Sequence, residues 1–248
     1  MSSESRPVEI TLRVAPEVFD RAPTFRRGVV IATKIDNLSV VADLERQLAS
    51  ALLRRREEPL DLGRDARFVD WDGAHRSFGS NPNKFPPAHK AIVKRVQRAD
   101  AGFKYINSIV AIMNTVSMVH LLPVGGDDLA EASRHGRVLE LRPAAGEEDF
   151  TPLGEPDLIE HPEMGEVIYA VGSKVMCRRW NWRNGHLTRI TENTRALVMN
   201  ADGIGAGSEE RASEARDYVA TLLGTYCGAQ IQVGLLSPQH PELRVIFG

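Results

Sequence analysis

The order of the expected secondary-structure elements constrains this fold more than any other feature of the chain. Helical patterns fall mainly between residues 40 and 119, whereas strand patterns dominate between residues 137 and 200. Strands that alternated regularly with helices would instead indicate a parallel sheet covered on both faces. The segregation of the two patterns predicts an α+β fold in which mixed sheets pack against helices.

Hydrophobic periodicity and turn residues place the individual elements. Polar and apolar residues alternate over residues 8–14, and residues 28–35 form an apolar run typical of a buried strand. Residue pairs 172–173 and 184–185 favour hairpin turns, and residues 122–128 also indicate a turn. The remaining strands are expected at residues 137–142, 166–171, 174–182, 186–200 and 229–236, and helices at 40–57, 65–78, 87–98, 105–119 and 209–223.

Length and composition limit the class of protein. The 248 residues are 42% hydrophobic and 26% charged, which suffices for a full core. We expect an N-terminal extension with a strand over residues 1–24 and a single domain over residues 25–248. No apolar run approaches the roughly 20 residues of a membrane span, no secretory signal is evident, and two cysteines are too few for a disulfide framework. These features predict a cytoplasmic protein without a membrane partner.

Arginine and tryptophan are concentrated in residues 177–185. Two of the three tryptophans of the chain lie here, beside three arginines and two asparagines. Arginine binds carboxylates and phosphates in a bidentate manner, and tryptophan provides an apolar wall or a stacking face. The segment therefore predicts a site for an anionic or nucleotide-like ligand that includes Arg178, Arg179 and Asn181. The alternative is an amphipathic strand with buried tryptophans and solvated arginines.

Two of the expected helices carry candidate binding residues. Asn107 and Asn114 lie two turns apart on the helix at 105–119, where their partners are either backbone groups or a ligand. His120 ends that helix, in a structural or a catalytic role. The helix at 87–98 carries Lys90, Lys94, Arg95 and Arg98, a face that either binds phosphates or is simply solvated.

The sequence shows no clear pattern for a metal site, a phosphate-binding glycine loop or a cysteine nucleophile. The seven histidines and two cysteines do not have the spacing of a metal site, and there is no phosphate-binding glycine loop. Cys177 has no adjacent base, which favours an inert buried thiol over a nucleophile. We therefore expect no metal and no other cofactor. The net charge of −2 also means that any nucleic-acid surface must be a local patch.

Three segments together resemble a known family. Residues 83–95, 106–128 and 178–194 are similar to a free-standing B3/4 domain, the tRNA-editing domain of the phenylalanyl-tRNA synthetase β subunit. The resemblance covers roughly residues 25–235. It implies a three-layer α+β fold with a pocket between helices and sheet. That pocket would bind a wrongly attached amino acid and hydrolyse its ester with a positioned water, without a side-chain nucleophile.

The resemblance also implies a set of pocket residues. Gly125, shortly after Pro123, stands at or near the family's histidine, and Asn200 stands where a strand glutamate recognises the amino acid. Of the family's hairpin glycine pair only Gly185 is kept, so no catalytic group carries over. The implied substrate pocket comprises Asn114, His120, Pro123, Gly125, Gly126, Arg178, Arg179, Asn181, Gly185 and Asn200, and the implied tRNA-backbone contacts are Lys90, Lys94 and Arg98.

The sequence thus predicts an aminoacyl-tRNA deacylase. It would bind the aminoacyl end of a tRNA and hydrolyse mischarged or non-standard aminoacyl-tRNA in trans. Two alternatives remain at this point. The same pocket could serve an enzyme that acts on a free amino acid or a related metabolite, or the chain could be a non-catalytic module that binds tRNA or protein.

Overall fold

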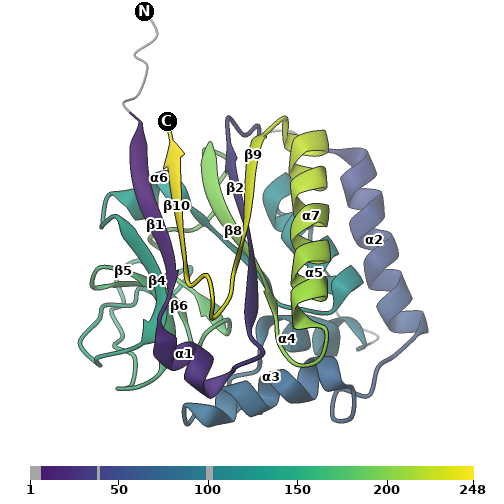
Figure 1. Ribbon diagram of the computed structural model, residues 1–248. Helices are drawn as coiled ribbons and strands as arrows, with labels where there is room; N and C mark the ends of the chain where they lie inside the picture. Colours follow the sequence, from purple (N-terminus) through teal and green to yellow (C-terminus); the bar gives the residue numbers. More distant parts are fainter. Residues whose placement is uncertain (1–6, 38–39, 99–102) are drawn as a thin grey trace, which may run out of the picture.

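The computed structural model describes residues 7–37, 40–98 and 103–248, which form two β-sheets and a layer of helices (Figure 1). The six-stranded sheet has the order β10-β1-β4-β5-β6-β7, and the four-stranded sheet has the order β3-β8-β2-β9. The four-stranded sheet is the middle layer, with the larger sheet on one face and helices on the other. The predicted α+β class is confirmed.

The two sheets combine segments from the whole chain. In the larger sheet β1 pairs in parallel with β4 and antiparallel with β10, whereas all pairs in the smaller sheet are antiparallel. The larger sheet contains β1 (Val8–Val14), β4 (Val138–Pro143), β5 (Val167–Val171), β6 (Lys174–Arg178), β7 (Arg183–Asn184) and β10 (Glu242–Phe247). The smaller sheet contains β2 (Arg26–Thr33), β3 (Val124–Asp128), β8 (Ala196–Gly203) and β9 (Gln230–Leu236).

The helices cover one face of the middle layer and one end of the molecule. Helices α2 (Ala42–Glu57), α5 (Ser108–His120) and α7 (Ser208–Cys227) form the outer layer beside the smaller sheet. Helices α3 (Ala66–Ser77) and α4 (Ala88–Val96) lie across the lower end in Figure 1. The short helices α1 (Pro16–Arg21) and α6 (Leu129–Ser133) connect strands.

Strand β2 shows why the middle layer is apolar on both faces. Val29 and Ile31 belong to the core between the two sheets, whereas Val30 and Ala32 belong to the core beneath the helices. Alternate residues of a strand point to opposite faces, so burial on both sides requires a continuous apolar run. A Cβ at Gly28 would lie 2.5 Å from the carbonyl oxygen of Ala212, so this glycine lets α7 approach β2 closely.

Several predicted elements differ from the structure. Residues 122–128 were expected to form a turn, but Val124–Asp128 form strand β3 against β8, which is a long-range pairing that overrides the poor strand propensity of glycine. The strand expected over residues 186–200 begins only at Ala196. The strand expected last, β9, is a largely accessible edge strand, and β10 follows it.

The hairpin turn also differs from the prediction. It was expected at residues 184–185, but it lies at residues 179–182, because Arg178 pairs with Arg183 across β6 and β7. Arg179 and Trp180 occupy the left-handed region with φ of 47° and 66°. Such a conformation is uncommon for residues other than glycine and persists only where the surroundings enforce it.

Candidate functional site: a polar cavity between the two sheets

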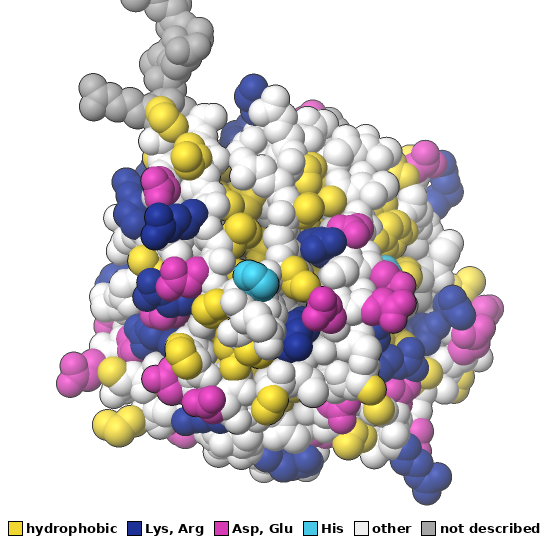
Figure 2. All heavy atoms as spheres, in the orientation of Figure 1, with side chains coloured by type: hydrophobic (Ala, Val, Ile, Leu, Met, Phe, Trp, Pro, Cys, Tyr) yellow, Lys and Arg dark blue, Asp and Glu magenta, His cyan; other side chains and the backbone are white. Residues whose placement is uncertain are grey.

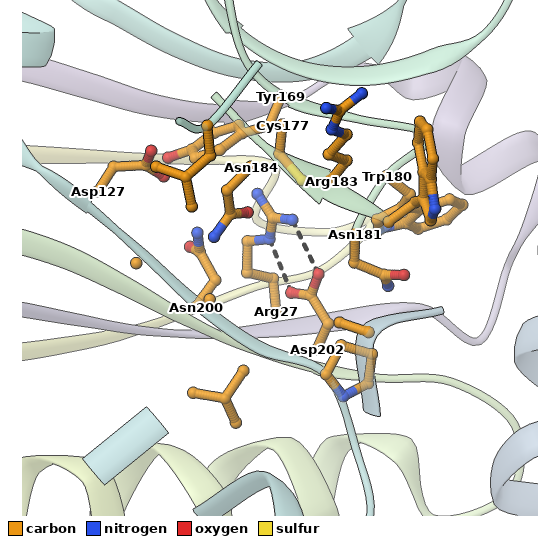
Figure 3. Close-up of a pocket in the computed structure, with 17 residues that line it drawn as sticks. Arg27, Asp127, Tyr169, Cys177, Trp180, Asn181, Arg183, Asn184, Asn200 and Asp202 are labelled. Carbon is orange, nitrogen blue, oxygen red and sulfur yellow. Dashed lines mark hydrogen bonds and ion pairs between the residues drawn. The ribbon is translucent and has the colours of Figure 1, made fainter. Parts of the chain in front are cut away.

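A cavity of about 390 Å³ lies between the two sheets (Figure 3). The smaller sheet contributes Arg27 from β2 and Asn200 and Asp202 from β8. The larger sheet contributes Tyr169 from β5 and Cys177 from β6. The turn at residues 179–182 and the N-terminus of α4 close one side.

Strand register brings the polar residues of β8 and β3 together. Asn200 and Asp202 are two residues apart and therefore project from the same face of β8. Gly125 pairs with Asn200, and Asp127 lies two residues further along the same face of β3. A Cβ built at Gly125 would meet no atom within 4 Å, so the cavity is open at this wall.

A buried ion pair forms part of the cavity wall. The guanidinium of Arg27 donates to Asp202 through Nε at 2.8 Å and Nη2 at 2.9 Å, and each residue is only 3% exposed. Burial alone would lower the pKa of Arg27, but the charge and hydrogen bond of Asp202 raise it. The guanidinium also lies 4.9 Å from the ring centroid of Tyr169. Removal of either partner would leave an uncompensated buried charge.

Asp127 is the cavity residue best suited to proton transfer. Burial raises the pKa of its carboxyl to about 7, although the hydrogen bond from Thr188 Oγ1 at 2.5 Å opposes this shift. A carboxyl that titrates near neutral pH can accept or donate a proton under physiological conditions. Burial also raises the pKa of the Tyr169 phenol and the Cys177 thiol, so both stay protonated at neutral pH.

A hydrogen bond with His75 fixes the side chain of Asn181. The Nε2 atom of His75 lies 3.2 Å from Asn181 Oδ1, and His75 is fully buried on α3. The backbone carbonyl of Asn181 accepts a hydrogen bond from the Ala88 amide at 3.1 Å. The turn is thereby attached to both helices beside the cavity.

The chain is similar to a known protein family and to a solved structure. The family model of the B3/4 domain matches residues 70–228. The chain belongs to the B3/4 domain family. Among solved structures, it is similar to an N-terminal fragment of the phenylalanyl-tRNA synthetase β subunit from Pyrococcus horikoshii, with 12% identity and a TM-score of 0.43. That similarity covers 90% of this chain and 50% of the fragment, and no curated protein matches.

The cavity of this B3/4 domain brings together half of the predicted pocket residues. Those that line it are Pro123, Gly125, Gly126, Asn181 and Asn200. The cavity nevertheless lies between the two sheets, whereas the resemblance implied a pocket between helices and sheet. The middle sheet separates α5 from the cavity, which explains why residues of that helix do not reach it.

Arg178 and Arg179 do not line the cavity, contrary to the prediction. Arg178 donates to Glu166 through Nε at 3.0 Å and Nη2 at 2.8 Å, and through Nη1 to Glu160 at 2.7 Å. Arg179 donates to Glu163 at 3.1 Å and lies 4.0 Å from the ring centroid of Phe85. The prediction treated these residues as a strand. The turn instead directs both guanidinium groups toward glutamates of the loop between β4 and β5.

The other predicted pocket residues also lie elsewhere in the B3/4 domain. Asn114 faces a separate surface groove between α4 and α5. His120 packs against Tyr218 of α7, with ring centroids 5.7 Å apart. Gly185 forms an isolated bridge with Pro152, where a Cβ would approach the backbone of β6.

The basic residues of α4, and Arg98 two residues after its end, differ in accessibility. Lys90 forms an ion pair with Asp72 at 2.5 Å, and its side chain is only 13% exposed. Lys94 and Arg98 are exposed. Lys90 is therefore occupied within the protein, whereas Lys94 and Arg98 are accessible to a partner.

Sequence reasoning missed Arg27, Asp127, Tyr169 and Asp202. One signal could have found two of them: a charged residue in phase with the inward-facing residues of an apolar strand. Arg27 precedes Val29 and Ile31 at two-residue spacing, and Asp202 continues the alternation of β8. A charge in such a position requires a buried partner.

The described part of the chain contains neither a candidate metal cluster nor a candidate membrane span. Outside residues 1–6, 38–39 and 99–102, no group of three or more His, Cys, Asp or Glu residues could hold a metal ion. Across those same described residues, no helix has the length and hydropathy of a membrane span.

Proposed function

We propose that the cavity binds the aminoacyl group at the 3′ end of a tRNA and that the protein hydrolyses mischarged or non-standard aminoacyl-tRNA in trans. The observation that carries this proposal is the polar cavity, with Asp127 and the Arg27–Asp202 pair, in a member of the B3/4 domain family. The resemblance of the chain to the editing domain of a tRNA synthetase supports the same function.

Asp127 is the proposed proton acceptor. Ester hydrolysis requires water to lose a proton while its oxygen attacks the carbonyl carbon. A carboxyl with a pKa of about 7 is partly ionised at neutral pH and can accept that proton. The bond between the carbonyl carbon and the ribose oxygen then breaks, and the ribose oxygen takes the proton from Asp127.

The Arg27–Asp202 pair is the proposed binding group for the backbone of the aminoacyl moiety. Nε and Nη2 of Arg27 bond to Asp202, and Nη1 makes no hydrogen bond with any described residue. In the proposed complex Nη1 stabilises the negative charge that develops on the carbonyl oxygen, which is the main electrostatic requirement of this reaction. Asp202 accepts a hydrogen bond from the α-ammonium group.

The surface beside the cavity supports a tRNA partner. Ala88 lines the cavity, and Lys94 lies six residues later on α4, about 9 Å along the helix axis. Exposed Lys94 and Arg98 can therefore contact phosphates near the acceptor end.

The face shown in Figure 2 differs from this surface. Basic and acidic side chains are interspersed there over β1 and β10, where Arg13 pairs with Glu242 at 2.6 Å.

A deacylation assay with a panel of mischarged tRNAs tests this proposal. We expect the protein to accelerate hydrolysis of at least one ester and Asp127→Asn to reduce kcat by about 10²- to 10⁴-fold. Asp149→Asn is the matched control, because Asp149 lies outside the cavity in an ion pair with Lys174. If no member of the panel is hydrolysed faster than in buffer, the proposed activity is wrong.

A second candidate function is supported by the ion pair itself. One buried guanidinium beside one buried carboxylate matches the opposite charges of a free amino acid, which would be the substrate of a metabolic enzyme. Calorimetric titration with tRNA and with free amino acids, each at two salt concentrations, separates the two functions. tRNA binding must weaken with salt because phosphate contacts release counterions, whereas binding of a buried amino acid should change little. Salt-dependent tRNA binding without hydrolysis would instead indicate a non-catalytic module.

A further inference from the structure

Three buried polar atoms of residues that line the cavity make no hydrogen bond within the described part of the chain: Asn200 Oδ1, Asn181 Nδ2 and Trp180 Nε1. Asn200 is only 7% exposed, and its Oδ1 atom makes no hydrogen bond with the described residues. The Nδ2 atom of Asn181 is also buried and makes none within the described part of the chain. Both residues line the same cavity, Asn200 from β8 and Asn181 from the turn. A buried unsatisfied polar group is costly, so such an atom indicates a missing partner.

His75 determines which end of the Asn181 amide is free. Burial lowers the pKa of His75 to about 4, so the ring is neutral at pH 7 and carries one N–H group. Because the amide oxygen of Asn181 can only accept, the 3.2 Å contact between His75 Nε2 and Asn181 Oδ1 is a hydrogen bond only when the N–H group is on Nε2. The donor atom Nδ2 is then the one left for a ligand.

Apart from Arg27, the cavity therefore presents two unpaired donors, Asn181 Nδ2 and Trp180 Nε1, and one unpaired acceptor, Asn200 Oδ1. The charges of Arg27 and Asp202 compensate one another, and in the proposed complex the pair binds the backbone of the aminoacyl group, so neither charge is left for its side chain. A charged substrate side chain would lose its hydration without gaining a free counter-ion, and an apolar side chain would leave both asparagine atoms unsatisfied. A neutral group that both accepts and donates hydrogen bonds satisfies them.

We propose that the site selects aminoacyl groups with a neutral hydrogen-bonding side chain, a hydroxyl or a carboxamide, through Asn181 Nδ2 and Asn200 Oδ1, with His75 as the positioning residue for Asn181. This inference rests on the proposed function, because it assigns the aminoacyl group to the same cavity. It explains why one amide atom of each asparagine, Oδ1 of Asn200 and Nδ2 of Asn181, is buried without a partner in the described part of the chain.

Isosteric substrates give the sharpest test. Threonine and valine have nearly the same shape, as do asparagine and leucine, so each pair differs mainly in hydrogen bonding. Hydrolysis of the four aminoacyl-tRNAs is compared by kcat/KM. We expect the polar member of each pair to be preferred by on the order of 10- to 100-fold, since sites that hydrogen-bond a substrate group reject the analogue that lacks it.

Three variants assign the selectivity to residues. Asn200→Leu and His75→Phe should each bring the threonine-to-valine ratio toward one, and His75→Gln, which retains a donor, should restore part of it. A purely structural role of His75 would lower both rates and leave the ratio unchanged. Asn193→Leu is the matched control, because Asn193 is exposed outside the cavity and its variant should keep the wild-type ratio.

Binding of non-hydrolysable analogues separates this inference from the proposed hydrolysis. The probes are 3′-amino-3′-deoxyadenosine amides of threonine and valine, titrated by calorimetry. A preference for the threonine amide without hydrolysis of any ester would refute the enzymatic function and support the selectivity. Equal affinity for the two amides, or equal kcat/KM for the two esters, would refute the selectivity. If neither amide binds, both are wrong.

Discussion

Asp127 should make the stability of this protein fall as the pH rises through neutrality. Burial raises its pKa from the ordinary value of 3.8 to about 7 in the folded state. The unfolded chain releases this proton above pH 3.8, whereas the folded protein holds it until about pH 7. The unfolded state is therefore favoured progressively over this window, and stability contributed by the protonated carboxyl is lost as the pH increases.

The size of the effect follows from the two pKa values. Between pH 5 and pH 8 the contribution of Asp127 to the free energy of unfolding should decrease by about 2.5 kcal/mol, at 1.36 kcal/mol per pKa unit. Asp127→Asn removes the titration and keeps an acceptor for the Thr188 hydroxyl. The difference in stability between variant and wild type should therefore shift by this amount, in favour of the variant, between the two pH values.

Urea unfolding at pH 5, 6, 7 and 8 measures this difference. Burial lowers the pKa values of His75 and His89 to about 4 and about 3. These histidines therefore make the folded protein less stable as the pH falls below 6.5, their pKa in the unfolded chain. They contribute equally to both proteins and cancel in the comparison. Asp149→Asn is the control, because the hydrogen bond from Lys174 lowers the Asp149 pKa and its titration lies below the window.

A stability difference between Asp127→Asn and wild type that does not change with pH would refute the raised pKa of Asp127. If the stability of Asp127→Asn relative to wild type changes by less than about 0.5 kcal/mol between pH 5 and pH 8, the carboxyl does not titrate near neutrality in the folded protein. Asp127 would then be unsuited to the role of proton acceptor that we propose for it.

Other perturbations test the remaining parts of the site. Asp202→Ala should cost about 3–5 kcal/mol of stability by leaving Arg27 buried without a counter-charge, and Arg27→Met should rescue much of this loss in the double variant, measured by urea unfolding. Gly125→Trp should fill the open wall and abolish ligand binding in calorimetry while the far-ultraviolet circular dichroism stays unchanged; undiminished binding would place the ligand elsewhere. Replacing Lys94 and Arg98 by Ala should lower the salt slope of tRNA binding by roughly one to two units, and an unchanged slope would exclude this helix as the phosphate contact.

Local sequence patterns determined the class of fold and much of the element order. The apolar run at residues 28–35 requires a strand buried on both faces, and the hairpin at residues 172–173 joins β5 to β6 as predicted. The helices α2, α3, α4, α5 and α7 were each expected within a few residues of their observed bounds. These features depend on interactions between residues close in sequence, which periodicity and turn chemistry report directly.

Only the tertiary structure decided which polar residues form the site. Arg27 and Asp202 are 175 residues apart, and their bond exists because β2 and β8 are neighbours in register. Arg178 looked like a ligand contact in the sequence but pairs with Glu166 from the preceding loop. A charge in the sequence shows only that a partner is needed. The identity of that partner is set by long-range packing, which local pattern does not encode.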